Sequence, residues 1–307
     1  MRALQYVLVA GATVAYLLSF IFAYLNTFAV KGLYYSNNGD VDNKYFQQAS
    51  PAGIAFGIVW PIIYTWNLAG LIYILVSLCL ADNNSPLKTD PPILNTIFFI
   101  GYMLTFSITV GWLFAFDREI LGLGLALLIL AVCSAYVAIG SSCKALTDNI
   151  NSSVPVQKKV VWPVRIVVQN GLSTLATWLT VATLLNLVDV ILYQDSFGIT
   201  PPIKRGNLSI QNGSTVALVL LLVIILTYFV LDNFVWDRFT RFIFTPYPVL
   251  ILALSGLIAK LRPLDDASQN LIIASVELGL VVVALITKVS LVTYRSIAQR
   301  SAVATAK

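Results

Sequence analysis

Eight long apolar runs constrain this chain more than any other feature of its sequence. A helix needs about 20 apolar residues to cross the hydrocarbon core of a bilayer, and each run approaches or exceeds that length between polar or Pro/Gly-containing segments. The runs are residues 5–29, 53–80, 92–116, 120–143, 160–192, 215–235, 242–260 and 268–294. Hydrocarbon offers the backbone no hydrogen-bonding partner, so spanning segments of this kind form helices. We therefore predict an all-α, multi-pass integral membrane protein, a helical bundle of about eight transmembrane helices.

Composition supports this class and excludes others. The chain is 58% hydrophobic and 11% charged, whereas soluble domains carry about 25% charged residues. The formal net charge of +5 lies mostly between the apolar runs, which suits contact with membrane lipid and not with nucleic acid. The chain has no His, and Cys79, Cys133 and Cys143 are scattered. We predict no metal site and no catalytic residue, and enzymatic activity is the least supported class.

The orientation follows from the basic residues between the runs. With eight crossings, the side of the N-terminus carries 10 Lys and Arg residues and the opposite side carries 7. Cytosolic loops are the more basic ones, so we predict that both termini are cytosolic. The glycosylation sequons at Asn207 and Asn212 fall on the predicted outer side. The membrane of residence stays open.

Polar and aromatic side chains recur at helical spacing within two of the runs. They are Trp60, Tyr64 and Asn67 in the second run and Trp178, Ala182, Asn186 and Asp189 in the fifth. Each set lies along one face of its helix, and polar groups in a spanning helix face other helices or a cavity. Two interpretations remain: contacts that pack helices together, or the walls of a ligand pocket.

Asp189, Glu277 and Lys288 are charged residues inside the apolar runs that need an explanation. Asp189 and Glu277 are candidates for a transport path, because intramembrane carboxylates often mark one. Asp189 also lies close enough to the end of its run to reach the headgroups. Glu277 and Lys288 are 11 residues apart, about 16 Å along a helix. We therefore expect Glu277 to pair with a neighbouring helix and Lys288 to extend to the cytosolic surface.

Several of these residues resemble motifs of the translocator protein/tryptophan-rich sensory protein (TspO) family. The stretch Phe56-Gly-Ile-Val-Trp60-Pro-Ile-Ile-Tyr64 is similar to the family's second-helix pattern, and Trp178-Leu-Thr-Val-Ala182-Thr-Leu-Leu-Asn186 to its fifth-helix pattern. Trp112 falls in the helix that corresponds to the family's Trp-containing third helix. The resemblance covers residues 5 to 193. The first loop lacks the family's tryptophans, and no Lys or Arg lies within five residues after Tyr193, which lowers the expectation of sterol binding.

The resemblance implies a five-helix bundle that holds a flat apolar ligand such as a tetrapyrrole (heme or porphyrin) or a sterol. The implied ligand-binding residues are Trp60, Tyr64, Asn67, Trp112, Trp178, Ala182 and Asn186. The implied division of the chain is a TspO-like bundle (1–193), a polar extramembrane loop (194–214), three additional helices (215–295) and a short basic tail (296–307).

Three functions compete at this point. The leading one is a sensor or carrier for a hydrophobic small molecule. The second is a solute or ion transporter that uses Asp189 and Glu277. The third is a non-catalytic subunit, either a homodimer or part of a larger membrane complex, in which the polar faces only bind neighbouring helices.

Overall fold

The computed structural model describes residues 3–153, 155–195 and 199–305, and each of the eight apolar runs forms a helix. The prediction of an all-α integral membrane protein is confirmed. The main helices are α1 (Ala3–Thr27), α3 (Gly53–Cys79), α4 (Thr96–Asp117), α5 (Leu121–Ile150), α7 (Asn170–Leu192), α8 (Ile210–Val230), α10 (Pro246–Leu261) and α11 (Ser268–Thr305). Short helices lie between them: α2 (Asn38–Lys44), η1 (Asp82–Asn84), α6 (Lys158–Pro163) and α9 (Asp237–Thr240).

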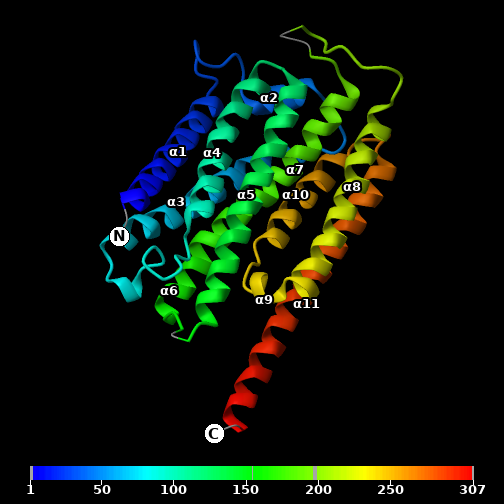
Figure 1. Cartoon of the computed structure of the whole chain (residues 1–307). Helices are drawn as coiled ribbons and strands as arrows, with labels where there is room; N and C mark the ends of the chain where they lie inside the picture. The colour runs from blue at the N-terminus through cyan, green and yellow to red at the C-terminus, as the bar shows by residue number, and fades with distance from the viewer. Residues whose placement is uncertain (1–2, 154, 196–198, 306–307) are drawn as a thin grey trace.

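Two segments of π-helix interrupt the spanning helices. One, η2 (Val164–Gln169), joins α6 to α7, and the other, η3 (Leu231–Val235), ends α8. Such segments are rare and often occur at functional sites. Both lie toward the same end of the bundle, where α6 and α9 are also found (Figure 1).

Among the described residues, seven helices are long and apolar enough to cross a membrane, and α10 is shorter. With 16 residues, α10 is about 24 Å long and does not reach across about 30 Å of hydrocarbon. It is shorter than the apolar run 242–260 because Pro246 fixes the first helical position, so the residues before it form a turn.

Helices α4 and α5 form the tight antiparallel hairpin that the three-residue connection at Asp117–Glu119 predicts. Glu119 adopts a positive φ of 58° in the turn. Gly101 allows the close approach, because a Cβ atom there would lie 2.8 Å from the Ser134 carbonyl oxygen. Small residues at helix interfaces serve this purpose in membrane proteins.

Helix α7 is the centre of the bundle. It contacts α3, α5, α8 and α10, and its side chains are the most buried of any spanning helix. The last three helices pack onto the first five: α10 contacts α3, α7 and α11, and the Ala52 amide donates to the Gly256 carbonyl oxygen at 3.1 Å.

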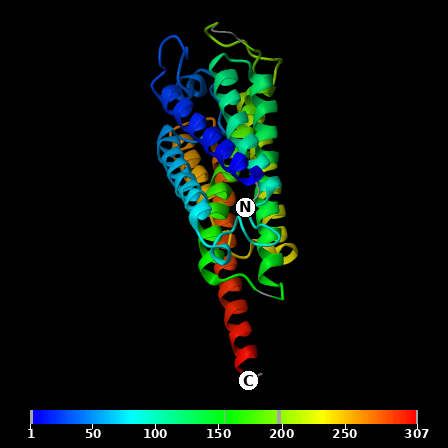
Figure 2. The same cartoon turned by 60° about the vertical axis from the view of Figure 1, so that its left-hand side comes forward.

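The outer surface suits lipid. Large apolar side chains are exposed along α1, α3, α8 and α11, as expected where lipid and not water is the solvent. Helix α11, with 38 residues, is about 57 Å long and extends past the other helices at the C-terminal end in both views (Figures 1 and 2). Residues 296–305, which the sequence assigned to a short basic tail, are part of this helix.

Candidate ligand-binding site

The structure brings the aromatic residues of α3 and α7 into contact. The Trp178 ring meets the Trp60 ring edge-on at a centroid distance of 6.3 Å and the Phe56 ring at 5.3 Å. Trp60 also stacks on Tyr64, with centroids 5.9 Å apart. Trp178 is fully buried, and its indole N–H has no hydrogen-bond partner among the described residues. These rings form one continuous aromatic surface between the two helices.

Tyr64 and Asn67 make packing contacts in the bundle. The Tyr64 hydroxyl lies 3.1 Å from the Ser19 hydroxyl, and the Tyr64 carbonyl oxygen accepts from the Tyr16 hydroxyl at 2.7 Å. The Asn67 amide donates to the Gly171 carbonyl oxygen at 2.9 Å and so joins α3 to α7. The Tyr64 hydroxyl and the Asn67 side-chain nitrogen are therefore occupied by the protein.

Trp112 and Asn186 form a separate pair. The Trp112 indole N–H donates to the Asn186 side-chain oxygen at 3.2 Å, and the Asn186 amide donates to the Ala182 carbonyl oxygen at 3.3 Å. Asn186 lies two turns after Trp178, about 12 Å along the helix. The residues implied by the resemblance thus do not form one cluster. Trp60 and Tyr64 lie at the level of Trp178, and Trp112 lies at the level of Asn186.

A cavity of about 450 Å³ lies beside the group of Trp60, Tyr64 and Trp178, and none of the seven residues implied by the resemblance lines it. Four aromatic rings give it an apolar interior: Trp66, Trp162, Phe242 and Phe244. The remaining lining residues are Val59 and Ile62 of α3, Arg165 and Ile166 of η2, Asn170 and Thr174 of α7, and Thr245, Pro248, Val249 and Leu252 at or near the start of α10. The cavity therefore lies between α3, the α6–η2–α7 segment and α10.

The cavity continues the rows of residues found in the sequence. On α7, Asn170 and Thr174 precede Trp178 at intervals of four residues, so all three lie along one row. On α3, Trp66 faces the cavity while Trp60 lies on the neighbouring face. Extending the row of polar and aromatic residues in the fifth apolar run by two turns before Trp178 therefore reaches Thr174 and Asn170, which line the cavity.

Asn170 holds this region together. Its side-chain amide donates to the carbonyl oxygens of Arg165 and Phe242, each at 2.8 Å. Its side-chain oxygen accepts from the backbone amides of Phe244 at 2.9 Å and Thr245 at 3.3 Å. One buried side chain thus fixes the segment before α10 against the junction of η2 and α7.

Arg165 is the cation in the cavity wall. Its guanidinium lies over the Phe242 ring at 4.0 Å and 5.4 Å from the Trp162 ring centroid, as in cation–π contacts. Sequence reasoning missed this residue, although a signal was present: an arginine inside the fifth apolar run that belongs to neither loop. A charged side chain inside a spanning helix has a high free-energy cost, so it is a candidate functional residue on that ground alone.

The transport candidate Asp189 lies inside the protein. It is 3% exposed and accepts from the Gln47 amide at 2.6 Å. The same amide also donates to the Leu185 carbonyl oxygen at 3.0 Å. The loop before α3 therefore binds the end of α7, and the alternative in which Asp189 reaches the headgroups is wrong.

Glu277 is also fully buried, on α11. Neither of its carboxyl oxygens has a hydrogen-bond partner in the described part of the chain. The expectation that it pairs with a neighbouring helix is wrong, and the two transport candidates sit in different environments.

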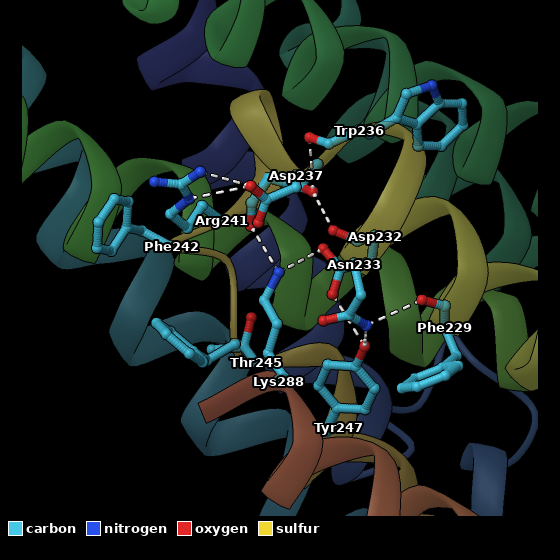
Figure 3. A network of polar contacts seen from close by, with 12 residues as sticks. Phe229, Asp232, Asn233, Trp236, Asp237, Arg241, Phe242, Thr245, Tyr247 and Lys288 are labelled. Carbon is cyan, nitrogen blue, oxygen red and sulfur yellow. Dashed lines mark hydrogen bonds and ion pairs between the residues drawn. The ribbon is translucent and has the colours of Figure 1, made fainter. Parts of the chain in front are cut away.

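Lys288 does not extend to the surface, and that prediction is wrong. Its side chain is 1% exposed and its ammonium lies 2.8 Å from Asp232, which is fully buried (Figure 3). Asp232 also accepts from the Tyr247 hydroxyl at 2.9 Å, and Asn233 donates to that hydroxyl at 3.2 Å. Lys288 is held inside because η3 and α9 supply its acceptors, namely the Asp232 carboxylate at 2.8 Å and the Thr240 carbonyl oxygen at 3.3 Å.

A second set of ion pairs surrounds this one. Asp237 pairs with Arg241 at 2.6 Å and with Arg295 of α11. Arg295 also donates to the Asn233 carbonyl oxygen at 3.1 Å. Together these contacts join η3, α9 and α11, and Figure 3 shows the pair of Asp237 and Arg241.

Comparison with known proteins agrees with this architecture. The family model described as TSPO-like protein matches residues 8–290. The chain belongs to the TSPO-like protein family. The match includes α8, α10 and most of α11, which the resemblance in the first five helices had left as an extension. No curated protein and no solved structure matches this TSPO-like protein at a significant level.

Metal binding has no support in the described residues. Among them, no group of three or more His, Cys, Asp or Glu side chains could hold a metal ion.

Proposed function

We propose that this TSPO-like protein binds a flat hydrophobic ligand, tetrapyrrole-like or sterol-like, inside the membrane and acts as a sensor or carrier. The observation that carries the proposal is the aromatic-walled cavity between α3, η2, α7 and α10. Its volume of about 450 Å³ is within the range of about 300–1,000 Å³ typical of small-molecule sites. Four rings in its lining offer faces for a planar ligand.

The mouth of the cavity supports entry from the bilayer. Ile62, Trp162 and Ile166 line it and are 43%, 43% and 51% exposed. These residues lie within the predicted spanning segments, where lipid is the surrounding solvent. A hydrophobic ligand would therefore reach the site without passing through water.

The lining residues favour a ligand that contains no iron atom for the protein to coordinate. Haem iron is usually held by His, Cys, Met or Tyr, and none of the cavity-lining residues is one of these. The residues present do not fit a ligated heme. A metal-free porphyrin or a sterol, held by ring contacts, fits them better.

A fluorescence titration tests the proposal. Trp66 and Trp162 line the cavity, so protoporphyrin bound there should quench tryptophan emission saturably, and unlabelled cholesterol should compete if it shares the site. Val249→Phe narrows the cavity from α10, and we expect at least a tenfold weaker affinity. Val137→Phe, at a position on α5 that is 53% exposed and outside the cavity, is the control and should bind like the parent.

A third variant locates the ligand relative to the aromatic surface of α3 and α7. Trp178→Phe removes the indole N–H, which lacks a partner among the described residues. A weaker affinity in this variant would extend the site to the residues that the sequence indicated. Absence of saturable binding of both protoporphyrin and cholesterol to the parent chain would refute the proposed function.

Transport is the second candidate, and Glu277 is the observation that favours it. A buried carboxyl without a partner is costly and is often retained for function. In proteoliposomes, Glu277→Gln should then abolish ion or proton flux while the fold is kept, and Asp189→Asn provides the parallel test. Equal flux in the parent and in both variants would exclude this candidate.

A further inference from the structure

Arg165 lies in the membrane-spanning segment Lys158–Leu192, seven residues from its start, or about 10 Å along the helix. That depth places it near the boundary between headgroups and hydrocarbon. No carboxylate in the described part of the chain pairs with it, and its guanidinium makes none of the hydrogen bonds found there. A charge in this environment is costly unless it is compensated.

The geometry of the guanidinium leaves its donors available. Its Cζ atom lies 4.0 Å from the Phe242 ring centroid, and this contact with the ring occupies none of its N–H donors. A guanidinium edge binds a phosphate or carboxylate through two parallel hydrogen bonds. The contact with Phe242 therefore holds Arg165 in place without using its anion-binding edge.

The other polar groups of the cavity are occupied. The Asn170 side chain makes four hydrogen bonds within the protein. The hydroxyls of Thr174 and Thr245 both donate to the Asn170 carbonyl oxygen, and the Trp66 indole donates to the Ile166 carbonyl oxygen. Recognition of a polar ligand group in this cavity falls to Arg165.

The surrounding charge favours an anion. Lys158 and Lys159 begin α6 at this end of the bundle. The nearby Asp237 is already paired with two arginines. No Asp or Glu is among the residues that line the cavity, so a negative headgroup there would meet Arg165 and no carboxylate in the lining.

We propose that Arg165 and the cavity form a site for one anionic membrane phospholipid, with its phosphate on the guanidinium and one acyl chain in the apolar cavity. The lipid-facing mouth and the depth of Arg165 favour a bilayer lipid over a water-borne acid. The inference uses the cavity of the proposed function but does not depend on the flat ligand, which would compete with the acyl chain.

Native mass spectrometry of the full chain in detergent tests this site. Phosphatidylglycerol and phosphatidylcholine with identical acyl chains are titrated, and we expect the first phosphatidylglycerol to bind at least tenfold more tightly. Arg165→Gln should abolish that preference, and Arg165→Lys, which keeps the charge but loses the paired donors and the stacking, should retain part of it.

Arg238 provides a matched control. It also lies over a ring, Phe239, at 4.3 Å, but it does not line the cavity. Arg238→Gln should therefore keep the full preference for phosphatidylglycerol. Equal loss in the Arg165 and Arg238 variants would show only general attraction to a basic surface and would overturn the proposal, as would an unchanged preference in Arg165→Gln.

Two further experiments distinguish a phospholipid from a fatty acid and from the flat ligand. If oleate displaces phosphatidylglycerol at lower concentration and with the same dependence on Arg165, the occupant is a free fatty acid and the phospholipid assignment is wrong. Cholesterol binding should be unchanged in Arg165→Gln but weakened in Val249→Phe. Loss of lipid preference with intact cholesterol binding would thus support the lipid site independently of whether the flat-ligand proposal holds.

Discussion

Replacing Lys288 with methionine should destabilise the protein more than any surface substitution. The Lys288–Asp232 pair is 2.8 Å long, with side chains 1% and 0% exposed. Without the ammonium, the Asp232 side chain keeps only the Tyr247 hydroxyl as a side-chain donor among the described residues. Leaving one member of a buried ion pair uncompensated costs about 3–5 kcal/mol, and we expect the free energy of unfolding to fall by about that amount.

The double variant Lys288→Met/Asp232→Asn separates charge from packing. The asparagine side-chain oxygen can still accept from Tyr247, and no buried charge remains. The residual loss should be that of one or two hydrogen bonds, about 1–2 kcal/mol. The second substitution is therefore expected to restore roughly 2–3 kcal/mol.

Reversible unfolding by SDS in mixed micelles, followed by circular dichroism, measures these differences. Lys144→Met is the control, because Lys144 pairs with Asp148 at 2.6 Å but the side chains are 71% and 48% exposed, and such helix pairs contribute about 0.3–0.5 kcal/mol. The reasoning is refuted if Lys288→Met costs no more than this control, or if the double variant is as unstable as the single one.

Three further predictions use the same unfolding assay. Gly70→Ala places a Cβ atom 2.8 Å from the Val167 carbonyl oxygen, so η2 must shift; a loss of about 1–3 kcal/mol is expected, and none would mean that η2 is free to move. Glu277→Leu removes a buried carboxyl that lacks a partner among the described residues and should stabilise the fold by about 1–3 kcal/mol; destabilisation would reveal a partner. Asn170→Ala deletes four hydrogen bonds and should cost about 2–4 kcal/mol, with faster hydrogen exchange at the Thr245 amide; unchanged exchange there would contradict its anchoring role.

The helices were predictable because their signal is local. Apolar length and polar punctuation locate α1, α3 and α4 to within a few residues, since backbone hydrogen bonding in lipid leaves few alternatives. The boundary of α10 differed because Pro246, a single residue, sets its start. The continuation of α11 beyond residue 295 follows no continuous apolar run, since its last turns mix polar residues with alanine, isoleucine and valine.

The buried charges were not predictable for the opposite reason. Lys288 and Asp232 are 56 residues apart, and Gln47 and Asp189 are 142 residues apart. A lysine near the end of an apolar helix usually extends to the interface, and only the tertiary arrangement reverses that preference. Helical spacing tells which residues share a face but not which helix will cover it.

The cavity shows how this limit applies to the site. Helical spacing placed Trp60 with Tyr64, and the two rings do stack, but Tyr64 and Trp178 are buried in the interior of the bundle. The residues that line the cavity lie on the adjoining face of α3 and earlier along the α7 row, where α10 supplies the opposite wall. The first five helices alone do not contain that wall.

Under the proposed function, helix α10 gives the last three helices a role in binding as well as in packing. It is too short to span the hydrocarbon straight, yet it contacts α3, α7 and α11, so its position depends on its neighbours. Asn170 fixes its start and the Ala52 amide binds near its end. Because the same contacts that hold α10 also define the cavity, loss of Asn170 should weaken ligand binding and stability together, whereas Val249→Phe should weaken binding alone. Parallel changes in both variants would mean that the cavity is only a by-product of packing.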